Sequence, residues 1–103
     1  MEIHELTEKI EKISQIYARK FNIKRDLPWF VLKLQEEMGE LIQSYLMLSG
    51  QARTKDKAYH EIRENFEHEI VDVLCHTLLL ARHAGMDLEK NIQEKWLKYE
   101  SKP

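Results

Sequence analysis

The sequence has little of several residue types that define common classes of protein. Its 103 residues include one cysteine, two prolines and three glycines. Because Cys75 is alone, no internal disulfide is possible, which fits a reducing cytoplasmic compartment. Sixteen basic and eighteen acidic residues give a formal charge of −2. The basic excess typical of nucleic-acid-binding proteins is therefore missing, and we expect no nucleic-acid partner.

Long hydrophobic runs are missing as well. The most apolar stretch, residues 70–81, is interrupted by Asp72 and His76 and is too short to span a bilayer. The charged segment from Met1 to Glu5 has no apolar core and does not fit a signal peptide. We expect a cytoplasmic protein with no membrane partner. The length predicts a single domain over residues 1–103.

No alternating apolar–polar pattern is long enough to predict a strand. Apolar residues instead recur every three or four positions, which predicts helices over residues 3–20, 27–49, 58–84 and 88–99. An aspartate precedes the second and fourth helices as a cap, and a glycine follows the second and third as a stop. These four residues are Asp26, Asp87, Gly50 and Gly85.

Four helices with short connections predict an all-α fold, an antiparallel four-helix bundle. The third helix is apolar on most sides, and the chain is small. We therefore expect dimerisation or tetramerisation to complete the core. The predicted core stripe of the second helix consists of Phe30, Leu34, Met38, Leu41, Tyr45 and Leu48.

Two pairs of acidic residues share the same spacing. Glu37 and Glu40 lie three apart on the second helix, and Glu69 and Asp72 lie three apart on the third. Residues three apart are about 60° from each other around a helix and one turn along it. Each pair can therefore direct two carboxylates at one point between the helices.

Apolar neighbours distinguish these acids from the others. Glu37 falls within the predicted core stripe, and Asp72 lies within the apolar residues 70–81. An isolated buried carboxylate costs several kcal/mol, and four together repel one another. A hard divalent cation resolves both problems, and all-oxygen ligands suit Mg²⁺, with Mn²⁺ as a substitute.

Acidic residues at this spacing also occur on ordinary solvated helix faces. Glu61, Glu64 and Glu67 fit that interpretation, because their part of the third helix is polar. If Glu37 is considered without the other three acids, a structural role is the favoured interpretation. All four acids together, on two apolar-flanked helices, favour a metal site formed by Glu37, Glu40, Glu69 and Asp72.

The two acidic segments resemble a known family. Glu36-Glu37-Met38-Gly39-Glu40, followed by Glu69-Ile70-Val71-Asp72, is similar to the E-E-x-x-E … E-x-x-D motif of MazG-like pyrophosphohydrolases. These enzymes belong to the all-α nucleoside triphosphate pyrophosphatases. The likeness covers residues 21–99, and the downstream Lys95-Trp96 falls at the expected spacing.

The resemblance implies that the four acids bind Mg²⁺ and that a nucleoside triphosphate is cleaved to a monophosphate and pyrophosphate. Such chemistry depends on positioning and charge stabilisation, so it needs no Ser, Cys or His nucleophile. Glu36 or Glu37 would orient the attacking water, and Glu36 could instead pair with Lys33.

The resemblance also suggests substrate contacts. Lys95 corresponds to a family lysine that touches the triphosphate, and Phe21 and Trp29 precede the acidic helix where relatives hold the base. Lys33 and Tyr99 are further candidates. Relatives often carry asparagine at the position of Tyr99, which leaves the choice of base and sugar open.

Other metal-dependent helical proteins fit less well. A di-iron bundle needs Glu-x-x-His pairs and a zinc protease needs His-Glu-x-x-His, and the sequence has neither. We interpret the histidines as surface or packing residues, and His76 could be a satisfied core histidine. The alternative to an enzyme is a noncatalytic helical bundle for oligomerisation or partner binding.

Overall fold

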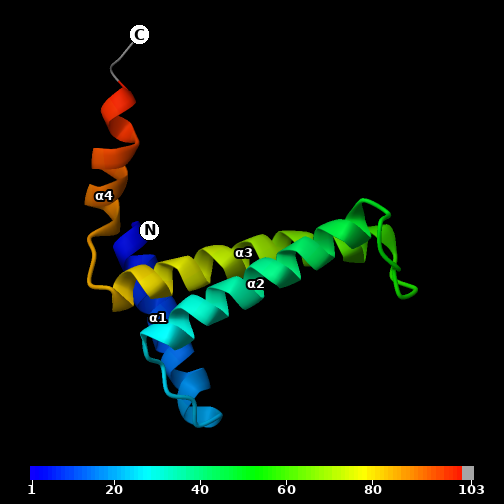
Figure 1. Cartoon of the computed structure of the whole chain (residues 1–103), viewed down its shortest axis with the longest axis horizontal. Helices are drawn as coiled ribbons and strands as arrows, with labels where there is room; N and C mark the ends of the chain where they lie inside the picture. The colour runs from blue at the N-terminus through cyan, green and yellow to red at the C-terminus, as the bar shows by residue number, and fades with distance from the viewer. Residues whose placement is uncertain (101–103) are drawn as a thin grey trace.

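The fold is all-α, as the sequence predicts. The computed structural model describes residues 1–100, which form four α-helices and a short 3₁₀ helix, with no strand among them (Figure 1). None of the described helices is both long and apolar enough to cross a membrane. The helices are α1 (Ile3–Lys20), α2 (Leu27–Leu48), α3 (Tyr59–His83), α4 (Leu88–Lys95) and η1 (Leu97–Tyr99).

The helix ends follow the predicted signals. The Asp26 side chain accepts a hydrogen bond from the Trp29 backbone N–H (3.0 Å), and Asp87 caps α4 in the same way. Gly50 and Gly85 adopt positive φ angles of 80° and 70° after α2 and α3, a conformation that costs little only for glycine. The fourth helix is shorter than predicted, because the α-helix ends at Lys95.

The long helices α2 and α3 form an antiparallel hairpin that contains the most extensive helix–helix contact of the described chain (Figure 1). Phe30 of α2 and Ile62, Leu78 and Leu79 of α3 are almost fully buried. This hairpin therefore supplies most of the small core.

Helix α1 crosses one end of the hairpin and packs against α3 (Figure 1). A buried ion pair joins it to the α1–α2 connection: Arg25 donates to both oxygens of Glu11, at 2.8 and 2.6 Å. Arg82 of α3 lies 3.6 Å from the same carboxylate. The guanidinium of Arg25 holds the pKa of Glu11 below its usual value, so this contact tethers α1 to its neighbours.

The antiparallel four-helix bundle is not confirmed within one chain. Helix α4 has its main contact with η1 and projects away from the hairpin (Figure 1). The radius of gyration is 16.7 Å, whereas a compact domain of this length has about 13 Å. The single chain is therefore extended.

The predicted core stripe on α2 is wrong in part. Phe30 is buried, but Met38 is 40% and Tyr45 52% exposed. The buried side of α2 is instead centred on Phe30, Glu37 and Ser44, seven residues apart and hence in line along the helix. The prediction was wrong in part because the contact with α3 is shifted around α2 toward Glu37 and Ser44, which leaves Met38 and Tyr45 at its edge.

Candidate metal centre

The hairpin brings the predicted acidic residues together. Carboxylate oxygens of Glu37, Glu69 and Asp72 lie within 4.8 Å of one another, across the α2–α3 contact. A second group with the same spacing, formed by Glu36, Glu37 and Glu40, shares Glu37 with the first. Glu37 is therefore common to both groups of potential ligands.

Burial and mutual repulsion perturb the acids. Glu37 is only 7% exposed; its burial, together with the nearby charges of Glu40 and Asp72, raises its pKa to about 7. Burial also raises the pKa of Glu69, with Glu40 and Asp72 adding to the effect. Without a cation, the ionised cluster is thus unfavourable at neutral pH.

Two oxygens of the cluster lack hydrogen bonds. Among the described residues, Oε2 of Glu37 and Oε2 of Glu69 are buried and have no hydrogen-bond partner. Buried polar atoms are normally paired, and an unpaired carboxylate oxygen is costly. A divalent cation bound by oxygen ligands would satisfy both atoms, so the donor set fits Mg²⁺ or Mn²⁺.

The predicted burial of Asp72 is wrong. Asp72 belongs to the acidic group but is exposed rather than buried in an apolar segment. Its neighbours Val71 and Leu74 are also about half exposed. Apolar neighbours failed to predict burial because Asp72 lies at the edge of the α2–α3 contact, where it lines an open cavity between α1, α2 and α3.

Lys33 and His76 border the cluster. Lys33 lies 2.9 Å from Glu36 and 3.9 Å from Glu37, and the Glu36 hydrogen bond raises the pKa of Lys33. His76 Nε2 lies 3.7 Å from Oε1 of Glu37, and its Nδ1 is buried without a hydrogen-bond partner in the described chain. Burial, followed by Lys33, lowers the pKa of His76. His76 is therefore not a satisfied core histidine.

A cavity of about 420 Å³ opens beside the cluster. Of the predicted substrate residues, Trp29 and Lys33 line it, together with the acids Glu37 and Asp72. The contribution of α1 to this cavity was not predicted, although the α1 residues that line it are spaced as on one helix face. They are Ile10, Ile13, Ser14 and Tyr17, and α3 adds Cys75, His76 and Leu79.

The other predicted substrate residues do not line this cavity. Phe21 lies at the end of α1, with its ring 4.8 Å from that of Tyr17. Lys95 and Tyr99 lie on α4 and η1, which point away from the hairpin (Figure 1). The single chain thus gathers the acids, Trp29 and Lys33, but not the C-terminal residues.

Comparisons with protein-family models, curated proteins and solved structures gave no significant match.

Proposed function

We propose that this protein is a Mg²⁺-dependent nucleoside triphosphate pyrophosphohydrolase of the MazG-like kind. The observation that carries the proposal is the grouping of Glu37, Glu69 and Asp72 across two helices, with a buried, unpartnered oxygen on Glu37. An acidic surface used only for solubility would have no reason to bury that carboxylate.

Glu37, Glu40, Glu69 and Asp72 would hold the cation. When bound, Mg²⁺ would neutralise triphosphate charge and lower the pKa of a coordinated water. Glu36 is the better candidate to orient the attacking water, because it lies outside the group formed by Glu37, Glu69 and Asp72. Its hydrogen bond from Lys33 lowers its pKa, which keeps it ionised as a base requires.

The adjoining cavity suits the nucleoside. Its volume of about 420 Å³ falls within the range of small-molecule sites, about 300–1,000 Å³. Tyr17 and Trp29 offer aromatic surface to a base, and Lys33 offers positive charge beside the acids. For Phe21, Lys95 and Tyr99, only the resemblance supports a substrate contact.

We propose that the enzyme is a homodimer or homotetramer. Five large apolar residues form an exposed stripe along α2, with spacings of four, seven, four and three: Leu27, Val31, Met38, Ile42 and Tyr45. The ring of Phe66 on α3 lies 6.2 Å from that of Tyr45, tilted by 48°, and the exposed Ile70 and Leu74 follow Phe66 at intervals of four. A continuous apolar surface of this kind is typical of a protein interface.

That surface also favours the second candidate, a noncatalytic oligomerisation module. Such a module would need the apolar stripe and not the acids. A melting curve with and without Mg²⁺ separates the two functions, because a cation that binds only the native state raises the melting temperature.

The direct test is a panel of ribonucleoside and deoxyribonucleoside triphosphates incubated with Mg²⁺ and analysed by chromatography. We expect a monophosphate and pyrophosphate from at least one substrate. Diphosphate and inorganic phosphate would refute the proposed bond cleavage, and no hydrolysis together with no Mg²⁺ stabilisation would favour the oligomerisation module.

A further inference from the structure

Ser14 of α1 has a hydrogen-bond donor that the fold does not use. The other serine and threonine residues within the α-helices each donate the hydroxyl proton to a carbonyl oxygen of their own helix: Thr7, Ser44 and Thr77. Ser14 donates no hydrogen bond within the part of the chain that the structure describes, and its Oγ instead accepts one from Arg25 (3.1 Å). Since a hydroxyl can accept and donate at once, the Ser14 proton is available to a ligand.

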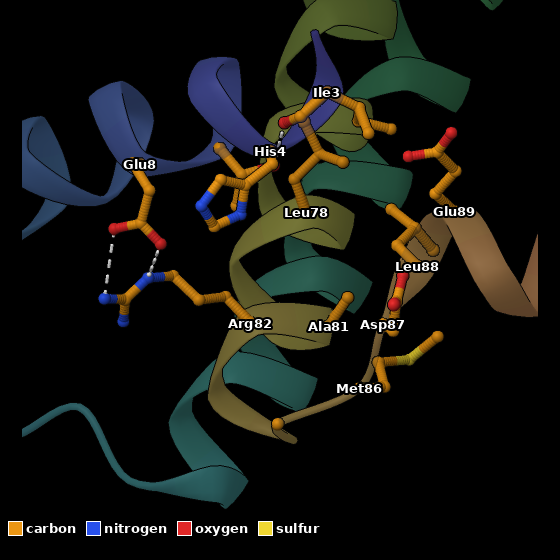
Figure 2. A pocket seen from close by; sticks show the side chains of 12 residues that line it. Ile3, His4, Glu8, Leu78, Ala81, Arg82, Met86, Asp87, Leu88 and Glu89 are labelled. Carbon is orange, nitrogen blue, oxygen red and sulfur yellow. Dashed lines mark hydrogen bonds and ion pairs between the residues drawn. The ribbon is translucent and has the colours of Figure 1, made fainter.

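Neighbouring charges hold Arg25 in place and thereby fix the orientation of the Ser14 hydroxyl. The Arg25 guanidinium also donates to both oxygens of the buried Glu11. Arg82 lies 3.6 Å from the same carboxylate and pairs with Glu8, as Figure 2 shows. Because a guanidinium N–H points at the Ser14 oxygen, the positive charge keeps the hydroxyl proton on the side away from Arg25.

Ser14 lines the cavity of about 420 Å³ beside the acids. The other cavity residues on α1 are Ile10, Ile13 and Tyr17, so Ser14 is the one small polar residue on this wall. Tyr17 lies about one turn further along α1, and Trp29 lines the cavity from α2. In a mostly apolar site, a single fixed donor determines how a ligand is oriented and which ligand is preferred.

We propose that Ser14 selects the base of the nucleotide by donating a hydrogen bond to the oxo group at C6 of a purine or C4 of a pyrimidine. This inference rests on the nucleotide ligand of the proposed function, not on its hydrolysis. The acids and Lys33, which would hold the phosphates, belong to α2 and α3, whereas Ser14 approaches from α1 and therefore meets the base.

The direction of the hydrogen bond sets the class of base. An oxo group accepts the Ser14 proton, whereas an amino group at the same position would bring one donor against another. The site should therefore prefer guanine, hypoxanthine, uracil or thymine to adenine and cytosine.

A second cavity in the molecule provides a matched control. It has a volume of about 600 Å³ and lies between α1, the end of α3 and the first turn of α4 (Figure 2). Thr7 lines this cavity, but its hydroxyl donates to the carbonyl oxygen of Ile3 (2.7 Å). Thr7 is thus a hydroxyl on the same helix whose donor is already used.

The test uses pairs of nucleoside monophosphates that differ mainly in an oxo or amino group: inosine against adenosine, and uridine against cytidine. The chain has two tryptophans, so Trp96→Phe leaves Trp29 as the only one, and quenching of its fluorescence in Mg²⁺ buffer measures binding. We expect the oxo member of at least one pair to bind about 3–10-fold more tightly, as one hydrogen bond allows. In this background, Ser14→Ala should remove the preference and Thr7→Val should retain it.

Equal affinity for both members of each pair before Ser14 is changed would overturn the inference, as would a preference that survives in Ser14→Ala or no binding of any of the four nucleotides. An equal loss of affinity for both members in Ser14→Ala would put the hydrogen bond on the sugar or phosphate, and would overturn it too. Monophosphates are not hydrolysed at the proposed bond. A preference that depends on Ser14, in a protein that cleaves no triphosphate, would therefore refute the proposed hydrolysis and leave this inference intact.

Discussion

The two sides of the α2–α3 hairpin differ in chemistry although they are built from the same helices. One side carries the acids, and the other carries the apolar stripe. Around α2, Glu40 is roughly 180° from Val31, since nine residues separate them at about 100° each. On α3, Asp72 joins the acidic group, whereas Ile70 and Leu74 are exposed beside Phe66.

Each side is unfavourable for the isolated chain, for opposite reasons. The acidic side buries one oxygen each of Glu37 and Glu69 without a hydrogen-bond partner in the described chain, and the apolar side leaves large hydrophobic residues in water. A cation would stabilise the first and a second copy the second. A buried charged residue and a cluster of exposed large apolar residues are both unusual in a folded protein, and each therefore marks a candidate site.

The largest effect should come from Asp72→Asn on the acidic side. Because the change removes one ligand charge with little change in shape, we expect hydrolysis to fall by about 100-fold or more, since substitutions of residues that only support metal ligands already cost about 10–100-fold. The Mg²⁺-dependent rise in melting temperature should fall with it. The metal-free protein should be no less stable, because repulsion within the cluster is relieved.

Glu64→Gln is the matched control for this prediction. Glu64 lies on the exposed part of α3, outside both acidic groups, so its substitution should change neither rate nor melting temperature. Full Mg²⁺-dependent activity in Asp72→Asn would eliminate Asp72 from the site.

The apolar side should respond to Ile42→Glu. A carboxylate placed in the centre of an interface loses hydration without gaining a partner, at a cost of about 3 kcal/mol, or on the order of 100-fold in the dissociation constant. Sedimentation at micromolar concentration should show the parent as an oligomer and the variant dissociated at this contact.

Leu32→Glu provides the comparison within the same helix. Leu32 is also exposed but lies about 80° around α2 from Ile42, outside the apolar stripe. The Leu32→Glu variant should have the same oligomeric state as the parent in sedimentation. If both variants dissociate equally, the stripe does not form the interface.

Much of this comparison could be predicted from the sequence, because helix periodicity reports which residues share a side. The helix ends, the burial of Glu37 and the meeting of Glu37 with Asp72 follow from caps and three-residue spacing. The packing of the outer helices could not be predicted in that way. Whether Asp72 is covered depends on α1, and neither the crossing of α1 nor the projection of α4 leaves a local signal.

The buried Glu11–Arg25 ion pair should contribute more to stability than an exposed pair, and it tethers α1, which forms one wall of the cavity beside the acids. Arg25→Ala leaves a buried carboxylate without its main partner, and we expect a loss of about 3 kcal/mol in the free energy of unfolding, measured by urea denaturation. The exposed pair Arg63–Glu67 (3.0 Å) is the control, and Arg63→Ala should cost less than about 1 kcal/mol. Equal losses would show that α1 is held by other contacts.

The smallest predicted effect is the pH dependence that Glu37 imposes on stability in metal-free buffer. The folded-state pKa of about 7 exceeds the ordinary value of 4.5, so between these values the folded protein binds a proton that the unfolded chain does not. Stability should therefore fall as pH rises through this window, by on the order of 2 kcal/mol from pH 5.5 to 8. His76 acts in the opposite direction, because its pKa is lowered.

The measurement is therefore the difference between the parent and Glu37→Gln in urea titrations at both pH values. The variant should gain stability relative to the parent at pH 8 and little at pH 5.5, and Mg²⁺ should reduce that gain by stabilising only the parent. A difference that does not change with pH would mean that Glu37 is ionised throughout and that the acidic side bears no cost for a cation to relieve.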